Sequence, residues 1–358
     1  MSLVNTKMQA LIARHQMDWN TLRAQEYGAL DLFATGTLLD ENIKQLALRS
    51  MGNTVKVPVF DSEEVTVANS RSCTISDNEN TSQLYQVVFT TLAAGFTVTP
   101  VLEQNNYIRT DEDFDRKMKK ISIAIADALD VLAVSALNIN KTQVFTDALD
   151  YGTTGNALQA PYESRFDLMG DIDSIMRSNG YRGSRLHVVG NAGVDNVFRH
   201  LAEHGMYNDV DKRLEYANKT LHFTNNITNG DGVFGGAFVV TEDAVGLLTR
   251  VDREALRGSR SLTGHEWGII NLPFANIPVG YHYYQAVGSK ASIAGDASAD
   301  MTCVITDHYE FSVDVAFITV YNTDLTTYPN PILKAELLSS QFQNRWALPV
   351  NVAEMPEE

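Results

Sequence analysis

Residues 110–140 read TDEDFDRKMKKISIAIADALDVLAVSALNIN, the most regular pattern in this 358-residue chain. Thr110 suits a helix N-cap, and the acidic residues after it stand where the helix dipole favours negative charge. Apolar residues then recur at steps of three and four: Phe114, Met118, Ile121, Ile125, Leu129, Leu132 and Ala136. This spacing predicts one amphipathic helix about 40 Å long, much longer than the average helix.

The segment before this helix, residues 53–109, has the pattern of β-strands. Valines alternate with other residue types near its start: Val55, Val57 and Val59. Branched and aromatic residues are frequent in residues 84–102, beyond a polar tip at residues 76–83. We predict a long two-stranded excursion. Because an isolated two-stranded ribbon is only marginally stable in water, we expect it to lie on a neighbouring subunit. The apolar residues expected to make that contact are Val87, Phe89 and Phe96.

The first 52 residues are predicted to form a helical arm. One helix face is expected over residues 8–22 and a second helix over residues 38–51, with Gly36 and Thr37 between them. Basic and acidic residues balance in this arm, so the rest of the chain carries the net negative charge. An amphipathic arm needs a surface to cover, in its own subunit or in a neighbour.

Residues 141–300 are predicted to form a separate α+β unit. Its expected elements are a helix through Phe166 and Ile175, a buried strand at residues 186–189, a helix at residues 194–204 and a strand at residues 238–241. Residues 258–300 have a mixed sequence and are predicted to be rich in loops. A strand is expected over residues 301–322, and Pro329 and Pro331 are expected to break regular structure after it.

Acidic residues outnumber basic ones by 44 to 28, which gives a formal net charge of −16. Such a surface repels phosphates, so specific nucleic-acid binding is not expected, although an acidic shell could still enclose nucleic acid. No apolar run approaches 18 residues and no signal peptide is evident, so we expect neither a membrane span nor secretion. Cys73 and Cys303 are expected to be reduced in a cytoplasmic product, although one disulfide between them is possible.

No arrangement of residues predicts catalysis, a cofactor or a metal. His200 and His204 have a spacing that suits zinc on a helix, but no third ligand is evident, and a packed or solvated helix accounts for them. Gly190 and Gly193 follow a predicted strand but match neither phosphate-binding motif, so a structural turn is preferred to a nucleotide site. The acidic residues after Thr110 are explained by the helix start without calcium.

Arginines cluster near the middle of the second half of the chain: Arg250, Arg253, Arg257 and Arg260. They alternate with Asp252 and Glu254. One interpretation is a solvated face with local salt bridges. The other is a contact with the acidic surface of a neighbouring subunit, made by Arg250, Arg253 and Arg257.

The order of these elements resembles the major capsid proteins of tailed bacteriophages of the Hong Kong 97 type. Three segments carry the resemblance: residues 110–140, residues 166–204 and residues 309–321. The resemblance implies an α+β fold with five parts. These are an N-terminal arm (1–52), an extended β loop on a neighbouring subunit (53–109), the spine helix of a peripheral domain (110–140), an axial domain (141–300), and the return strands of the peripheral domain with a C-terminal tail (301–358).

The resemblance further implies that the protein is not an enzyme. Its subunits would assemble as pentamers and hexamers into an icosahedral shell that encloses double-stranded DNA without sequence-specific binding. A separate scaffolding protein and a portal are the expected partners, with assembly in the host cytoplasm and the virion as the final location. Two alternatives stay open: an encapsulin-type nanocompartment shell, and an enzyme with a nucleotide site near Gly190 and Gly193.

Overall fold

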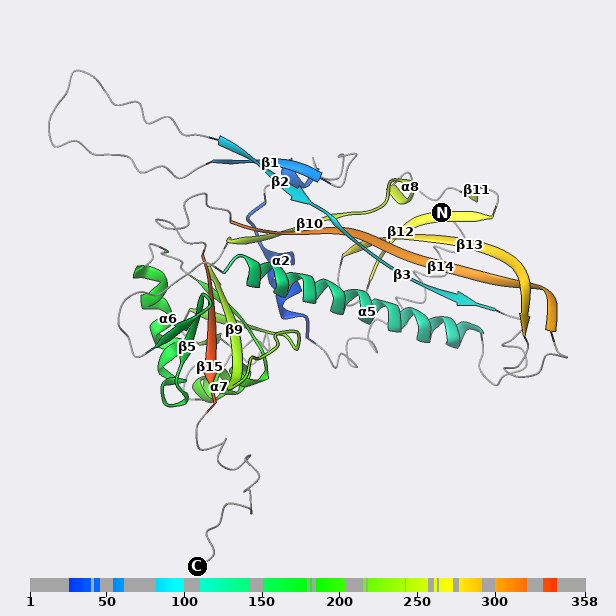
Figure 1. Ribbon diagram of the computed structural model, residues 1–358. Helices are drawn as coiled ribbons and strands as arrows, with labels where there is room; N and C mark the ends of the chain where they lie inside the picture. The colour runs from blue at the N-terminus through cyan, green and yellow to red at the C-terminus, as the bar shows by residue number, and fades with distance from the viewer. Residues whose placement is uncertain are drawn as a thin grey trace, which may run out of the picture. The chain divides into compact units, whose positions relative to one another are not determined.

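The computed structural model describes residues 26–39, 42–45, 54–60, 82–99, 110–141, 151–178, 181, 185–203, 215–216, 218–241, 243–256, 261–262, 264–272, 277–291, 300–320 and 331–339. They divide into two compact units, many of whose elements are labelled in Figure 1. Unit 1 takes its described residues from 39–132 and 246–318, and unit 2 takes them from 26–38, 133–245 and 319–358. Helices and strands are both abundant, so the predicted α+β class is confirmed.

Unit 2 contains a seven-stranded mixed sheet in the order β4-β5-β15-β9-β6-β8-β7. Its strands are β4 (Gly152–Thr154), β5 (Ala157–Ala160), β6 (Leu186–Gly190), β7 (Glu215–Tyr216), β8 (Lys219–Phe223), β9 (Val233–Thr241) and β15 (Ile332–Leu338). β5 pairs with β15 and β6 with β8 in parallel, whereas the other neighbours are antiparallel. The strands predicted at residues 186–189 and 238–241 are therefore confirmed. β15 was missed, because Pro329 and Pro331 precede a strand and do not end the fold.

Two helices of unit 2 bury their apolar faces in its core: α6 (Asp167–Ser178) and α7 (Ala192–Glu203). The fully buried residues of α6 include Met169, Ile172 and Ile175. They form one cluster with Val194 and Phe198 of α7 and with apolar residues of the sheet. Both helices were predicted from the recurrence of apolar residues, and both are confirmed.

One positive charge lies inside unit 2. Lys219 in β8 is only 1% exposed, and its Nζ atom lies 2.8 Å from Asp173 Oδ2 of α6 and 3.4 Å from the side-chain oxygen of Asn218. A buried charge is costly unless an opposite charge and hydrogen bonds compensate it. The contact with Asp173 therefore ties α6 to the sheet.

The short helix α2 (Gly28–Thr35) belongs to the predicted arm, yet it packs within unit 2. Its buried side chains include Leu30, Leu32 and Phe33. A Cβ atom on Gly28 would lie 2.4 Å from the carbonyl oxygen of Phe223, so glycine permits the close approach of α2 to β8. The helix ends before Gly36, as predicted. The helix expected over residues 8–22 lies outside the described residues.

Unit 1 contains a six-stranded sheet in which β10, β14, β13, β12 and β11 are successive neighbours and β3 also pairs with β14. The strands are β3 (Thr90–Val98), β10 (Val245–Arg250), β11 (Ser261–Leu262), β12 (His265–Asn271), β13 (Pro278–Ala291) and β14 (Asp300–Thr319). A single helical turn, α8 (Arg253–Leu256), follows β10. β14 confirms the predicted late strand. The prediction of loops over residues 258–300 is wrong, because β12 and β13 occupy much of that segment.

Glycines inside these strands mark close packing. A Cβ atom on Gly268 would lie 2.5 Å from the ring of Tyr281, and one on Gly280 would lie 3.0 Å from Val251. Since β13 pairs with β14, the described residues between 246 and 300 belong to unit 1. The prediction had placed them in a separate unit at residues 141–300. β15 belongs to unit 2 and not with the late strand β14. The predicted boundary at residue 300 is therefore wrong.

β1 (Thr54–Phe60) and β2 (Ser82–Val88) form a separate two-stranded antiparallel sheet, which we call the ribbon. The ribbon confirms the beginning of the predicted excursion. The excursion is shorter than predicted, however, because β3 pairs with β14 and belongs to the six-stranded sheet. Phe89 is the one residue between β2 and β3, and in Figure 1 these two strands follow each other along the chain.

The helix α5 (Thr110–Ile139) has 30 residues and confirms the prediction made from residues 110–140. The predicted apolar face is buried from Phe114 to Leu129. Beyond that point burial moves one residue along from the predicted positions, to Ala133 and Leu137. A helix has 3.6 residues per turn, so a pattern of threes and fours allows both continuations.

By length and composition, α5 could also cross a membrane, since an 18-residue stretch within Glu112–Ile139 has a mean hydropathy of 1.7. We expected no such segment from the sequence, because charged residues interrupt every apolar run. In the folded chain 44% of that stretch is buried. The core helix of a soluble protein has the same composition, so the buried face accounts for the hydropathy without a membrane.

Candidate assembly surfaces

The ribbon is anchored to the rest of unit 1 at its root. Val55 and Val87 are opposite each other in the β1–β2 pair, and both are buried, as is Phe89. We predicted Val87 and Phe89 as contacts with a neighbouring subunit. Their own chain already covers these side chains, so little apolar surface is left for a neighbour.

Phe96, the third predicted contact, packs between the six-stranded sheet and α5. Its ring stacks on Tyr309 and Phe311 of β14 at centroid distances of 5.0 and 6.0 Å, and it meets Phe114 of α5 edge-on at 5.4 Å. Such aromatic contacts fix β3 and α5 to β14. A contact between Phe96 and a neighbouring subunit stays a prediction.

Arg250, at the end of β10, makes its contacts within the chain. Its Nε and Nη2 atoms donate to Asp314 Oδ2 at 3.0 and 2.8 Å, and its guanidinium carbon lies 4.6 Å from the centroid of the Phe89 ring. The side chain is 11% exposed, so a neighbouring subunit could reach little of it. Arg253 is the first residue of α8, and Arg257 lies outside the described residues. For these two arginines, the contact with a neighbour stays a prediction.

The ribbon carries exposed apolar side chains. In β2, Tyr85 is 37% exposed and Val88 is 60% exposed. The structure shows no third strand beside β1 or β2 among the residues that it describes. Exposed strand edges and apolar side chains are places where another chain can pair and pack.

A second exposed apolar pair lies where β13 and β14 run past the rest of their sheet. β12 pairs with β13 only as far as Tyr284, and β3 pairs with β14 only as far as Asp307. β13 and β14 continue beyond as a pair, which we call the β13–β14 extension (residues 285–291 and 300–306). Val287 and Ile305 face each other there and are 69% and 47% exposed. Sequence reasoning missed both, because their pairing could not be seen without the register.

One face of the six-stranded sheet carries a layer of stacked rings. Trp267 stacks on His282 at 4.8 Å, and Tyr284 stacks on His308 at 4.5 Å. His265 Nδ1 lies 3.0 Å from His282 Nε2, so one ring donates a hydrogen bond to the other. Such cross-strand pairs stabilise a sheet and give β12, β13 and β14 a rigid common surface.

Tyr283 in β13 and Tyr309 in β14 alternate with the stacked rings along their strands, and both keep their phenolic protons. The pKa of Tyr283 is raised to about 12. Burial is the largest cause, and a 3.0 Å hydrogen bond to Asp307 is the next. Burial also raises the pKa of Tyr309, whose ring packs on Phe114 of α5 at 5.1 Å. Both phenols therefore stay neutral at physiological pH and act as packing groups.

The turn between β6 and α7 was the candidate nucleotide site. A Cβ atom on Gly193 would lie 2.3 Å from the carbonyl oxygen of Phe234, so the glycine lets α7 pack closely on β9. The side-chain oxygen of Asn191 accepts a hydrogen bond from the Gly236 N–H at 3.1 Å, and its amide nitrogen donates to Asn229 at 2.6 Å. Packing and hydrogen bonds within the chain therefore explain these residues without a nucleotide.

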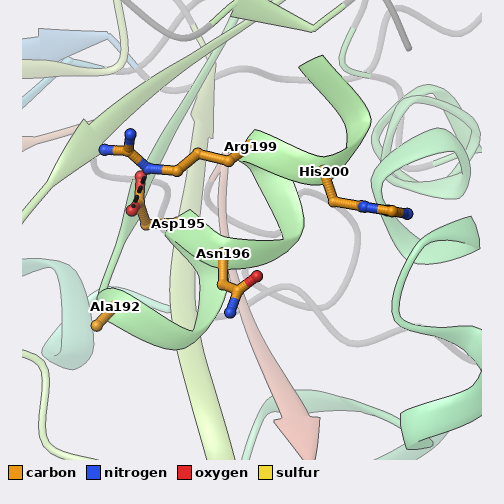
Figure 2. A pocket seen from close by; sticks show the side chains of 5 residues that line it. All are labelled: Ala192, Asp195, Asn196, Arg199 and His200. Carbon is orange, nitrogen blue, oxygen red and sulfur yellow. Dashed lines mark hydrogen bonds and ion pairs between the residues drawn. The ribbon is translucent and has the colours of Figure 1, made fainter. Parts of the chain in front are cut away.

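A shallow hollow lies along the outer side of α7. Figure 2 shows that its five labelled lining residues all belong to this helix: Ala192, Asp195, Asn196, Arg199 and His200. Arg199 reaches back to Asp195, with 2.7 Å between Nε and Oδ2. The single arginine is thus already paired with a carboxylate, so the hollow has no ready site for a phosphate group.

The two metal candidates have structural explanations. Asp113, in the first turn of α5, forms an ion pair with Lys117 one turn later. His200 packs on Phe166 with 4.8 Å between the ring centroids, and His204 lies outside the described residues. Within the described parts of both units, no group of three or more His, Cys, Asp or Glu side chains could hold a metal ion.

Replacing Gly193 with alanine should lower the free energy of unfolding by about 2 kcal/mol, because the new methyl group would press on the backbone of β9. Gly170→Ala is the matched control, since Gly170 lies in α6 with open space around its Cβ position. The control should stabilise the protein by about 0.5 kcal/mol, because alanine has the higher helix propensity. Urea unfolding measures both. Equal stabilities for the two variants would refute the packing role of Gly193.

No protein-family model matches this sequence, and no curated protein matches it. Among solved structures, the chain is similar to one titled "Mycobacterium phage Che8", with 12% identity and a TM-score of 0.49 over 84% of this chain and 89% of that chain. It is also similar to "Capsid structure of the Cyanophage P-SCSP1u" (10% identity, TM-score 0.46, 81% and 85% covered). A third is "Capsid of native GTA particle computed with C5 symmetry" (10% identity, TM-score 0.46, 88% and 92% covered). Two of these titles name capsids.

Proposed function

We propose that this chain is the major capsid protein of a tailed bacteriophage and assembles with copies of itself into a closed shell. One observation carries the proposal: two-stranded β segments carry apolar side chains that are exposed. These are Tyr85 and Val88 in the ribbon, and Val287 and Ile305 in the β13–β14 extension. Two-stranded segments are weak on their own in water and gain stability by lying on another surface.

The finer parts of the proposal follow the resemblance. The ribbon lies on a neighbouring subunit, and subunits form the pentamers and hexamers of an icosahedral shell. A separate scaffolding protein and a portal take part in assembly in the host cytoplasm. The virion encloses double-stranded DNA without reading its sequence, because a chain with a net charge of −16 repels phosphates.

An encapsulin-type nanocompartment shell is the alternative within the same architecture. The contents of purified particles separate the two functions, because a capsid encloses nucleic acid whereas a nanocompartment encloses a protein cargo. An enzyme with a nucleotide site near Gly190 and Gly193 is no longer favoured. The glycines that suggested that site are explained by the packing of α7 on β9.

Negative-stain electron microscopy of the purified full chain, with and without a crowding agent in solution, tests the proposal. We expect shells, sheets or rings of subunits from the native sequence. The double variant Val88→Lys, Val287→Lys should form at least tenfold fewer of them, because it places charges on both exposed apolar segments. Its melting temperature should stay within about 4 °C of the native value, since both sites are on the surface.

Thr153→Lys is the control for added charge, since it lies on the exposed strand β4 of unit 2. It should assemble normally. If the double variant assembles as well as this control, the apolar segments are not the contacts between subunits. A native chain that stays monomeric under both conditions counts against a shell protein altogether.

A further inference from the structure

The ribbon joins the six-stranded sheet through one residue, Phe89. β2 ends at Val88 and pairs with β1, whereas β3 begins at Thr90 and pairs with β14. The pairing of β2 with β1 therefore ends just before Phe89, and the pairing of β3 with β14 begins just after it. The direction in which the ribbon leaves the sheet depends on the backbone of this residue, on what holds its side chain, and on the packing of the buried root pair Val55 and Val87.

Three side chains hold that junction. The Arg250 guanidinium lies over the Phe89 ring, with 4.6 Å from its carbon to the ring centroid. Arg250 also donates twice to Asp314 Oδ2, at 3.0 and 2.8 Å. Thr91 lies directly opposite Asp314 in the β3–β14 pair, and its hydroxyl donates to Asp314 Oδ1 at 2.6 Å. We call Phe89, Thr91, Arg250 and Asp314 the clasp.

The clasp is largely shielded from water. The Phe89 residue is 4% exposed, and the Arg250 and Asp314 side chains are 11% and 18% exposed. Arginine suits this place better than lysine, because a planar guanidinium can lie on a ring while it donates two hydrogen bonds to a carboxylate. A shielded ion pair contributes little net stability compared with apolar groups of similar size, since its desolvation offsets its attraction. Its geometry is therefore its main contribution.

We infer that the clasp sets the direction of the ribbon, with Arg250 acting as a positioning residue through Phe89. Without the clasp, the ribbon samples a range of directions at Phe89. Ordering it again would add to the entropic cost of contact with a neighbour. This last consequence for assembly rests on the proposed function, whereas the effect on the ribbon itself does not.

Distance measurements by pulsed electron spin resonance test the inference on the unassembled full chain. Spin labels are placed at Gln86→Cys in the ribbon and Glu310→Cys in β14, both exposed, with Cys73 and Cys303 replaced by serine. With the clasp intact we expect one narrow distance distribution. In Arg250→Met with Asp314→Leu, which removes both charges of this ion pair, the distribution should become at least twice as wide. The melting temperature should change by less than about 4 °C.

The pair Lys334 and Glu336 in β15 offers a matched control, since its side chains are 17% and 15% exposed. Lys334→Met with Glu336→Leu should leave the distance distribution narrow. Arg250→Lys keeps the charge but lacks the planar fork, and its distribution should be of intermediate width. Should the double variant fail to fold, this single variant decides the question.

An unchanged distribution in the clasp variants overturns the inference. A wider distribution together with reduced shell yield supports both the clasp and the shell. A wider distribution with normal shell yield supports the clasp and contradicts the proposed contact between ribbon and neighbour. The two ideas can therefore fail separately.

Discussion

Excising residues 57–85 and joining Lys56 to Gln86 through an Asn-Gly turn should leave a folded protein that forms no shells. Lys56 and Gln86 face each other in the β1–β2 pair, so a two-residue hairpin turn can connect them. The buried root pair, Val55 and Val87, stays in place. Circular dichroism should give a melting temperature close to the native one, while sedimentation velocity and electron microscopy should find no assembled particles.

Mixing the excised chain with the native chain sharpens this test. In the proposed assembly, the excised chain would lack the surface that lies on a neighbour but would keep the surface that receives a neighbour's ribbon. It should therefore lower the yield of native shells in proportion to the amount added. Normal particles from the excised chain alone would show that the ribbon is dispensable. A lack of interference in the mixture would show that the excised chain has no receiving surface.

Replacing Asp173 with leucine should lower the free energy of unfolding by about 3 kcal/mol, the second of the two largest effects that we expect. The substitution leaves the Lys219 ammonium group buried, and among the described residues the side-chain oxygen of Asn218, at 3.4 Å, is its remaining hydrogen-bond partner. The structure of unit 2 joins α6 to β8 through this contact. Urea unfolding followed by far-ultraviolet circular dichroism measures the change.

Two further variants separate the buried charge from other effects. Asp173→Leu combined with Lys219→Met should recover most of the lost stability, because no unpaired charge remains. Asp195→Leu removes the partner of Arg199, whose side chain is 66% exposed, and should cost no more than about 0.5 kcal/mol. A loss below about 1 kcal/mol in Asp173→Leu would mean that Lys219 finds another partner or reaches water.

The helices could be predicted because their signals are local. α5, α6 and α7 each repeat apolar residues every three or four positions, and each of these faces is buried. Strands gave a weaker signal where glycine takes a strand position. Gly268 and Gly280 lie inside β12 and β13, where their missing side chains make room for Tyr281 and Val251.

The partners of each strand could not be predicted, because pairing depends on residues far away in the sequence. Burial alternates through Val87 and Phe89 and then shifts by one residue, because Thr90 and Thr91 are both exposed. The sequence has three apolar residues in a row there, Val87, Val88 and Phe89, so it does not show this shift from ribbon to sheet. Arg250 had the charge expected of a contact with a neighbour, but its partner Asp314 lies 64 positions away on the paired strand β14. The exposed pair of Val287 and Ile305 likewise depends on a register that the sequence does not state.

The position of β15 sets the order in which unit 2 can be completed during protein synthesis. β15 lies between β5 and β9, and its side chains Leu333, Ala335 and Leu337 belong to the core of the unit. Gln159 and Glu336, which are hydrogen-bonded across the β5–β15 pair, lie 177 positions apart. A nascent chain on the ribosome therefore lacks the strand that joins β5 to β9 until Leu338 has emerged. Pairing between such distant residues also makes folding slow.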